Sequence, residues 1–394
     1  MVLTAEGAQQ VFAADPENYD AFFKDGFTAI AGPASLWTLT GPAHRRERQL
    51  FWPVTHASHI SQYATIVHNI TRTYLEQWKT GQNIRAFDTT RAISRDVILR
   101  LVFGIEEGPL MDEGRKIMDE LSHASNPLIV FVAQLQRSWF PPWRRYIRAK
   151  QRFGDWVNRF LTQRRAEGGE KHDVIGNMLA ARYDDGSPMQ DNEIRDELIT
   201  VLIGGHETTA AGLAWALYEL GRDPVRLAKL QAELDNSGSA NDISMAVKLP
   251  YLGAVCDEIV RLHPILAECA RVLTEPMQIL GHTIAAGNVL IISILGIHHD
   301  PELYPEPNRF NPERFIERSY NRFEFLPFGG AHRRCLGAAL SEYETRIALA
   351  EIVLHWDFKT IGTDRDVRHG VPMGPKNGVP LKIKGQRVPV FAGK

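Results

Sequence analysis

The chain has 394 residues, of which 44% are hydrophobic, and a formal net charge of −2 at pH 7. This length allows a large buried core, and the near-neutral balance gives no reason to expect a nucleic-acid partner. Three cysteines, Cys256, Cys269 and Cys335, make no disulfide framework and fit a reducing compartment. No apolar run is long enough to span a membrane and no signal peptide opens the chain, so we expect a cytoplasmic protein without a membrane anchor.

Helical patterns dominate the chain up to about residue 262. We expect helices over residues 60–78, 89–102, 143–167 and 192–220. The last of these stops at Gly221, and Asp223-Pro224 is a typical N-cap and N1 pair for the next helix.

A β-type texture follows over residues 271–297, where Gly281 and Gly287 separate strand-like runs. A proline-rich irregular stretch, a helix over residues 336–355 and short terminal strands complete the chain. The pattern predicts a mainly α fold with a minor β region, and it disfavours the alternating βαβ order of a Rossmann-type fold. Without repeats or linkers, residues 1–394 are expected to form a single domain.

The stretch "FLPFGGAHRRCLGAAL", residues 325–340, places Cys335 behind a glycine- and arginine-rich loop at an expected helix start. Backbone N–H groups, the helix dipole and the charges of Arg333 and Arg334 could stabilise a thiolate there. Gly337 would let a bulky planar group approach the backbone. A catalytic nucleophile or a thiolate ligand to haem iron would fit, as would a small buried cysteine in a turn. A nucleophile needs a base and zinc needs partner ligands, and neither has a local signature.

A second stretch, "ITVLIGGHETTAAGLAWALYEL", has two glycines inside a strong helix pattern, Gly204 and Gly205, each costing about 1 kcal/mol. Glu207, Thr208 and Thr209 follow at once. One interpretation is a threonine that bonds the carbonyl four residues earlier. The other is a helix opened for a small ligand, with a hydroxyl and a carboxylate to deliver protons.

Two further patterns are weak on their own. Glu258 and Arg261 are at i,i+3 in "DEIVRLHP", and Arg314 in "FNPERF" could join them in a buried network, although most such pairs are exposed. His44 and Arg48 are at i,i+4 in "GPAHRRERQLFWP" and could clamp a carboxylate, although a basic helix face is the default.

Taken together in this order, these stretches resemble the cytochrome P-450 superfamily, the haem-thiolate monooxygenases, in the style of its soluble bacterial members. The resemblance implies a helix-rich triangular prism and haem b with Cys335 as its iron ligand. The implied haem-binding and structural residues are Phe328, Arg333, Cys335 and Gly337 in the cysteine loop; Gly204 and Gly205 in the oxygen-binding helix; His44, Arg48, Arg271 and Arg333 at the propionates; and the triad Glu258, Arg261 and Arg314.

The chain departs from the family at two places. Ala331 stands where the cysteine loop usually has glycine, which would cost about 1 kcal/mol if that position needs a positive φ. Family members also carry several dozen residues before the segment that resembles "VLTAEGAQQVFAADPENY", so we expect the usual N-terminal helix and strands to be missing.

The resemblance implies insertion of one atom of dioxygen into an apolar lipid, terpenoid, polyketide or aromatic compound. Thr208 would manage protons at bound oxygen, with Glu207 as its relay. Because the chain has no flavin or iron–sulfur motif, electrons would come from NAD(P)H through a separate ferredoxin or flavodoxin and its reductase. This partner would dock near Arg45 and Arg46. The alternatives are a peroxide-driven oxygenase and a non-catalytic, gas-sensing haem protein. The residues expected to line the substrate pocket are Phe27, Ile30, Leu202, Ile203, Leu266, Ala267 and Met373.

Overall fold

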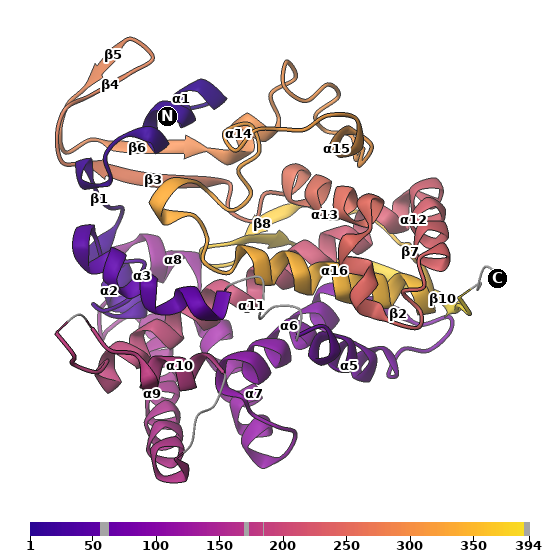
Figure 1. The fold of residues 1–394 in the computed structure, drawn as a ribbon, viewed down its shortest axis with the longest axis horizontal. Coiled ribbons are helices and arrows are strands. Elements are labelled where there is room, and N and C mark those ends of the chain that lie inside the picture. Colours follow the sequence, from indigo (N-terminus) through magenta and orange to yellow (C-terminus); the bar gives the residue numbers. More distant parts are fainter. Residues whose placement is uncertain (56–62, 169–172, 184, 390–394) are drawn as a thin grey trace.

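The computed structural model describes residues 1–55, 63–168, 173–183 and 185–389, and it is mainly helical with small β-sheets, as predicted (Figure 1). Within that part of the chain, no helix combines the length and apolar character needed to cross a bilayer. The helices are α1 (Ala5–Ala13), α2 (Lys24–Ala31), α3 (Gly41–Thr55), α5 (Ala64–Leu75), α6 (Ala86–Phe103), α7 (Pro109–Ala124), α8 (Pro127–Phe131), α9 (Pro141–Glu167), α10 (Val174–Ala180), α11 (Asp191–Arg222), α12 (Pro224–Asn236), α13 (Pro250–Leu262), α14 (Ile294–His298), α15 (Arg314–Glu317) and α16 (Ala338–His355).

In the described part of the chain, the strands form four small antiparallel groups, and the two three-stranded sheets among them join strands from distant parts of the chain. One sheet has the order β1-β3-β6, and Tyr19 is paired with Leu273 across its first two strands. A second sheet has the order β2-β10-β7, and two hairpins join β4 to β5 and β8 to β9. The strands are β1 (Tyr19–Ala21), β2 (Asn83–Arg85), β3 (Glu268–Leu273), β4 (Met277–Ile279), β5 (His282–Ile284), β6 (Val289–Ser293), β7 (Trp356–Thr360), β8 (Asp366–Arg368), β9 (Met373–Pro375) and β10 (Pro380–Gln386).

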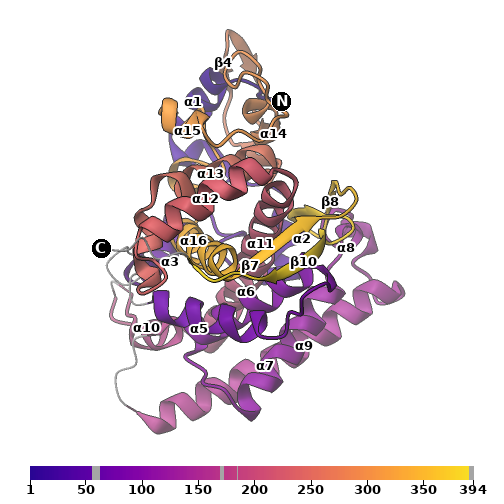
Figure 2. The same ribbon diagram turned by 90° about the vertical axis from the view of Figure 1, so that its right-hand side faces the viewer.

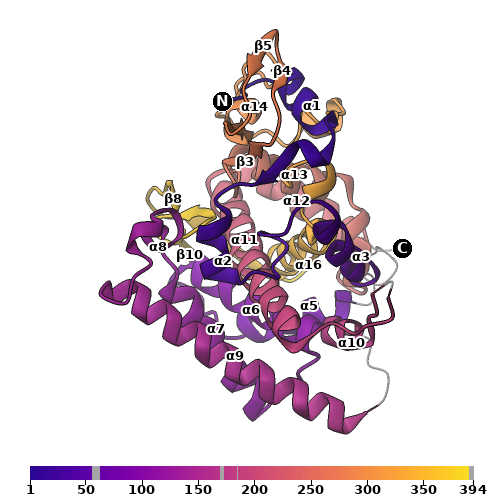
Figure 3. The same ribbon diagram turned by 90° about the vertical axis from the view of Figure 1, so that its left-hand side faces the viewer.

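Helix α11 runs through the middle of the molecule, and α6 and α16 pack against it (Figure 2). Its second half is buried on all sides because alanines let neighbouring helices approach closely, while Trp215 fills the larger gap. The outline is roughly triangular, with the β4–β5 hairpin at the narrow end and α7 and α9 at the broad end (Figure 3). The long helix therefore presents its glycine-containing middle to the interior.

The sequence placed most long helices correctly but missed several boundaries. Asp223 caps α12 with its side chain, as predicted, and α9 and α16 lie within two residues of the expected ranges. The expected helix over residues 60–78 corresponds to α5, and its expected first residues, 60–62, lie outside the described residues. The prediction of β structure over residues 271–297 is wrong for residues 294–297. These residues lie in α14, which Ser293 caps with its side chain. Phe27 and Ile30, which the sequence places at the substrate pocket, lie in α2.

Candidate active site

Cys335 lies between a short 3-10 turn, Ala331–Arg333, and the start of α16. Its N–H donates to the carbonyl of Phe328 at 2.9 Å, which closes the loop around the thiol. The side chain lies deep among protein atoms yet is accessible on one side. A Cβ on Gly337 would meet no atom within 4 Å, so the space beside the thiol is open. The sulfur is therefore accessible to a ligand from that side.

The electrostatics of Cys335 differ from the expectation of a ready-made thiolate. Burial raises the pKa of the Cys335 thiol above its ordinary value, and the N–H of Gly337 and the charges of Arg334 and Arg48 only partly oppose this effect. The expected stabilisation is present but burial outweighs it. A bound metal ion deprotonates a coordinating thiol outright, so the site suits a metal ligand better than a free nucleophile.

Ala331 adopts a φ of 57°, in the left-handed region. The position where the family usually has glycine therefore does need a positive φ, as the sequence suggested. A side chain in this region costs about 1–2 kcal/mol. The turn of the cysteine loop therefore contains local backbone strain at Ala331.

Three arginines and a histidine gather at the cysteine loop from three elements: His44 and Arg48 on α3, Arg271 on β3, and Arg333 in the loop. Burial, together with the charge of Arg333, lowers the pKa of His44 to about 3, so the imidazole is neutral at pH 7. Burial and the charge of Arg271 lower the pKa of Arg333 to about 10. Burial also lowers the pKa values of Arg48 and Arg271.

These arginines lack anionic partners of their own. Among the described residues, Arg48, Arg271 and Arg333 form no ion pair with a carboxylate. Arg271 donates to the carbonyl of Ala270 at 2.8 Å, and Arg333 donates to the carbonyl of Leu39. Buried cations are costly unless an anion offsets them. The group therefore fits an anionic ligand, and two carboxylates on one planar molecule would match it.

The two glycines of helix α11 have different surroundings. A Cβ on Gly205 would lie 3.0 Å from Ile98 of α6, whereas one on Gly204 would lie 3.5 Å from Trp37. Gly205 thus allows two helices to pack closely, a structural reason that the sequence did not reveal. Thr208 Oγ1 donates to the carbonyl of Gly204 at 2.7 Å, the bond that the simpler interpretation predicted.

Glu207 is held by a cluster of polar groups rather than free to swing. Arg91 Nη2 lies 2.6 Å from Glu207 Oε1, Ser122 Oγ donates to the same oxygen, and His206 Nε2 is 3.4 Å away. Burial alone would raise the pKa of Glu207, but the hydrogen bond from His206 and the charge of Arg91 hold it well below its usual range. The carboxylate is therefore ionised at neutral pH.

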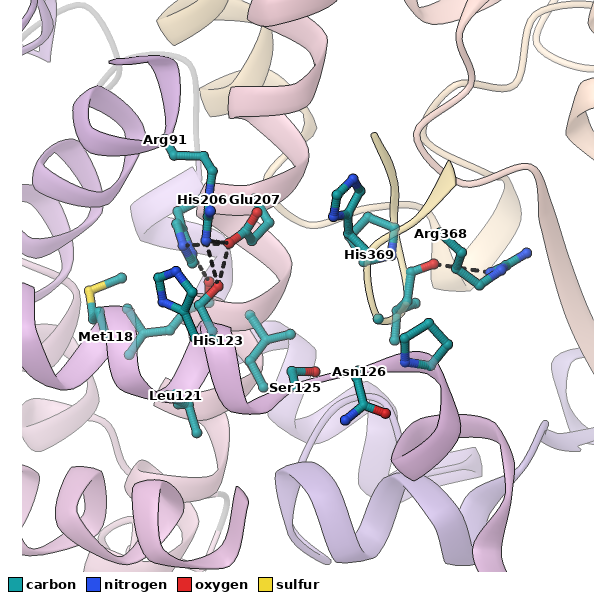
Figure 4. Close-up of a pocket in the computed structure, with 17 residues that line it drawn as sticks. Arg91, Met118, Leu121, His123, Ser125, Asn126, His206, Glu207, Arg368 and His369 are labelled. Carbon is teal, nitrogen blue, oxygen red and sulfur yellow. Dashed lines mark hydrogen bonds and ion pairs between the residues drawn. The ribbon is translucent and has the colours of Figure 1, made fainter. Parts of the chain in front are cut away.

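A cavity of about 270 Å³ lies beside this cluster, between α6, α7, α11 and the β8–β9 turn. Figure 4 shows Arg91, His206 and Glu207 linked on one side of it and His369 on the other. Its lining combines apolar and polar side chains: Arg91, Met118, Leu121, Ser122, His123, Ser125, Asn126, Pro127, Leu202, Ile203, His206, Glu207, Arg368, His369, Gly370, Val371 and Pro372.

Two of the seven expected pocket residues, Leu202 and Ile203, line this cavity. The ring of Phe27 packs edge-on against that of Trp37, with 5.6 Å between the ring centroids, and Ile30 is buried in a hydrophobic core. Met373 N donates to the carbonyl of Ile265, next to Leu266 and Ala267. Glu268, the first residue of β3, pairs with Arg368 of β8 at 2.5 Å.

Sequence reasoning missed the polar lining from α6 and α7. Arg91, Ser122 and His123 belong to no motif and lie more than 80 residues from Glu207 in the chain. Only the packing of α6 and α7 beside α11 brings Arg91 and Ser122 to the carboxylate.

The triad forms a buried network around the irregular segment that precedes the cysteine loop in the chain. Arg261 Nε lies 2.6 Å from Glu258 Oε2, and Arg314 Nε lies 3.1 Å from the same oxygen. All three side chains are buried. Arg261 also donates to the carbonyls of His298 and Pro307, both at 2.8 Å. The network joins α13 to the irregular segment that precedes the cysteine loop.

The family profile described as Cytochrome P450 matches residues 1–381. The chain belongs to the cytochrome P450 family, the haem-binding monooxygenases. A Mycobacterium tuberculosis protein described as cytochrome P450 138 is 32% identical over 384 residues, covering 94% of this chain and 83% of that protein. Cytochrome P450 137 of the same species is 31% identical over 365 residues, covering 91% and 75%.

Solved structures agree with this assignment at the level of the fold. A retinoic acid-bound cyanobacterial CYP120A1 superposes with a TM-score of 0.86 at 24% identity, covering 96% of this chain and 87% of that one. The haem domain of cytochrome P450DA gives a TM-score of 0.85 at 20% identity, covering 99% and 88%. The predicted family and fold class are confirmed.

Proposed function

We propose that this chain, acting as one P450 domain, holds haem b through Cys335 and inserts one atom of dioxygen into an apolar small molecule. The supporting observation is the accessible, deeply placed thiol of Cys335 facing arginines that lack carboxylate partners. Arg48, Arg271 and Arg333 would bind the two propionates, with neutral His44 as a hydrogen-bond donor. Haem with a thiolate ligand supplies dioxygen activation, because the sulfur pushes electron density toward the O–O bond.

The triad would have a structural role. Glu258 neutralises Arg261 and Arg314, and Arg261 fixes two backbone carbonyls ahead of the cysteine loop. A fixed loop keeps Cys335 at a constant position, which a ligand to a buried metal requires.

Thr208 and Glu207, on α11, would transfer protons to bound oxygen. The Thr208 hydroxyl donates to the carbonyl of Gly204, so its oxygen remains able to accept a hydrogen bond from a neighbouring donor. Glu207 is ionised and bonded to Ser122 and near His206, both of which line the cavity. We assign it the role of relaying protons between the cavity and Thr208.

The substrate would be an apolar lipid, terpenoid, polyketide or aromatic compound. The support is the apolar part of the cavity wall, which includes Met118, Leu121, Leu202, Ile203 and Val371. Phe27 would extend this wall through Trp37, which lies against Gly204. Ile30 would support it from behind, and Leu266, Ala267 and Met373 would close the side formed by β3 and β9.

Electrons would come from NAD(P)H through a ferredoxin or flavodoxin and its reductase. Arg45 forms an ion pair with Glu17 and Arg46 forms one with Glu47, both at 3.1 Å. These carboxylates offset the charges of the two arginines, which are therefore less suited to bind an acidic partner. Arg334 is exposed beside Cys335 and has no ion pair among the described residues. We therefore expect charge reversal at Arg334 to slow reduction by a ferredoxin at low salt more than reversal at Arg45 does.

The direct test is turnover of the haem-loaded protein with NADPH, a ferredoxin and its reductase. Compounds that shift the haem absorption band would first be selected from a library. The proposal predicts a product carrying one oxygen atom from labelled dioxygen. Equal turnover with hydrogen peroxide alone would favour a peroxide-driven oxygenase, and a haem that no organic compound perturbs would favour gas sensing.

A further inference from the structure

His263, the residue that directly follows α13, lies at a junction of three elements that the proposed function does not use. Its ring stacks on Trp215 of α11, with 4.0 Å between the ring centroids and 2° between the planes. Its Nδ1 lies 2.9 Å from Asp366 Oδ2 on β8, and its Nε2 lies 3.2 Å from Glu219 Oε1 on α11. One imidazole therefore contacts two carboxylates that come from distant parts of the chain.

Both ring nitrogens of His263 face groups that only accept hydrogen bonds. An ionised carboxylate donates none, so the ring satisfies both contacts only when each nitrogen carries a hydrogen, as in the imidazolium form. Burial alone would lower the pKa of His263, but the hydrogen bonds to Asp366 and Glu219 outweigh burial and raise it above its ordinary value. The geometry and the direction of this shift both favour a cation near neutral pH.

Asp366 depends on His263 for its counter-charge. The contact with His263 is the one ion pair that Asp366 makes within the described residues, and Asp366 Oδ1 is buried there without a hydrogen-bond partner. Glu219, by contrast, also has Arg222 Nη1 at 3.8 Å. A neutral imidazole carries no charge and can donate to only one of the two carboxylates. Deprotonation of His263 would therefore leave Asp366 as an uncompensated, partly buried anion.

Asp366 begins the hairpin whose turn forms one wall of the cavity. Strands β8 and β9 pair in antiparallel register, and residues 368–372 line the cavity, with His369 across from Glu207 (Figure 4). The N–H of His369 donates to the carbonyl of Pro372 at 2.8 Å, which closes the turn. The turn and the hairpin are therefore expected to move together.

The hairpin has two further attachments besides His263. The N–H of Met373 donates to the carbonyl of Ile265 at 2.8 Å, and Arg368 forms its ion pair with Glu268. The side chains of Arg368 and Glu268 are 31% and 38% exposed, whereas that of His263 is 12% exposed. Water therefore screens the contact with His263 less than it screens the other charged attachment.

We propose that His263 is a positioning residue for the substrate, whose imidazolium holds the β8–β9 hairpin so that its turn forms the cavity wall. The folded chain raises the pKa of His263, so the contact is fully present below about pH 6.5 and is lost as the pH rises through the folded-state pKa. Above that range the turn would leave the wall and the substrate would bind less tightly. The link to substrate rests on the proposed function, whereas the link between His263 and the turn does not.

Two other histidines lie close enough to be separated from His263 by experiment. Burial lowers the pKa of His299, and the charge of His263 adds to this effect, so His299 stays neutral over the same range. His369 belongs to the turn itself, where its ring packs against that of Phe87 with 5.7 Å between the centroids. A variant of His369 is therefore a necessary control.

Hydrogen exchange of the haem-loaded full chain tests the link to the turn. Exchange rates of the amides of residues 366–373 would be divided by the intrinsic rates from about pH 6 to about pH 9. Protection in the wild type should fall at least about tenfold as the pH rises, because a hydrogen bond between charged groups is lost. His263→Gln should have the lower protection at every pH. Asp366→Asn, at a side chain that is 33% exposed, should behave in the same way and tests the contact if His263→Gln does not fold.

Two histidine variants are the controls. His68→Gln removes a similar contact, 3.0 Å from His68 Nδ1 to Glu351 Oε2, between α5 and α16, and the turn should keep its wild-type pH dependence. The turn should keep it in His369→Gln as well. The proposal is wrong if protection of the wild-type turn does not depend on pH, or if the dependence persists in His263→Gln and disappears in His369→Gln.

Binding of a compound that shifts the haem absorption band tests the link to substrate. Its dissociation constant in the wild type should rise about tenfold over the same pH range, and in His263→Gln it should be high throughout. Equal affinity of the two proteins at about pH 6, with a loosened turn in His263→Gln, would overturn the positioning role. A turn that loosens as expected in a protein that binds no such compound would instead overturn the proposed function.

Discussion

Arg91 of α6 and Glu207 of α11, 116 residues apart in the chain, form an ion pair of 2.6 Å at the wall of the cavity. The pair keeps a buried carboxylate ionised one residue before Thr208. It connects the packing of two helices to the proton chemistry that we propose for the site.

Arg91→Leu should raise the pKa of Glu207, because burial would then be less offset. Product formed per NAD(P)H consumed should fall as the pH is lowered, through the range in which Glu207 becomes protonated. Stability should drop by about 2 kcal/mol, less than for a fully buried pair because Arg91 is partly exposed. Arg91→Lys should retain most of the wild-type pH profile. If coupling depends on pH in the same way in wild type and in both variants, Glu207 does not take part in proton transfer.

Thr208→Ala should leave haem content unchanged while diverting electrons to hydrogen peroxide, since the hydroxyl is proposed to manage protons. Thr209→Ala is a matched control: Thr209 makes the same kind of bond, to the carbonyl of Gly205 at 3.0 Å, but contacts Ser341 of α16. Peroxide and product would be measured against NADPH consumed. If both variants remain fully coupled, the Thr208 hydroxyl only satisfies the helix backbone.

Glu258→Ala should cost about 3–5 kcal/mol, because it strands Arg261 and Arg314 as buried charges. The yield of soluble protein and the ratio of haem to protein should both fall sharply. Asp88→Ala breaks an exposed i,i+3 pair with Arg85 and should cost less than about 1 kcal/mol. Wild-type haem loading in Glu258→Ala would show that the network is dispensable.

Ala331→Gly should stabilise the protein by about 0.5–1 kcal/mol, since glycine adopts a φ of 57° without strain but loses more chain entropy on folding. Denaturant unfolding of the haem-loaded protein measures this gain. Ala232→Gly, in the exposed face of α12, should instead destabilise by about 1 kcal/mol. Losses of equal size at both sites would mean that Ala331 is not strained.

Local sequence patterns predicted the features that depend on local chemistry. Asp223-Pro224 marked a helix start because an N-cap needs only neighbouring backbone, and Ala331 could be suspected because a positive φ is a property of one residue. Partners such as Ser122 of Glu207, or Ile98 against Gly205, depend on which helices pack together, and periodicity does not specify that. The pKa of Cys335 was misjudged for a related reason: burial, the larger effect, comes from distant segments.

The spectrum of the reduced protein with carbon monoxide tests the central claim most directly. If Cys335 is the proximal ligand, wild type will show the red-shifted Soret band typical of thiolate ligation, and Cys335→Ser will lose it. Cys269→Ser, at a partly buried cysteine on β3, should keep the band. A normal thiolate band in Cys335→Ser would contradict the assignment of Cys335 as the haem ligand.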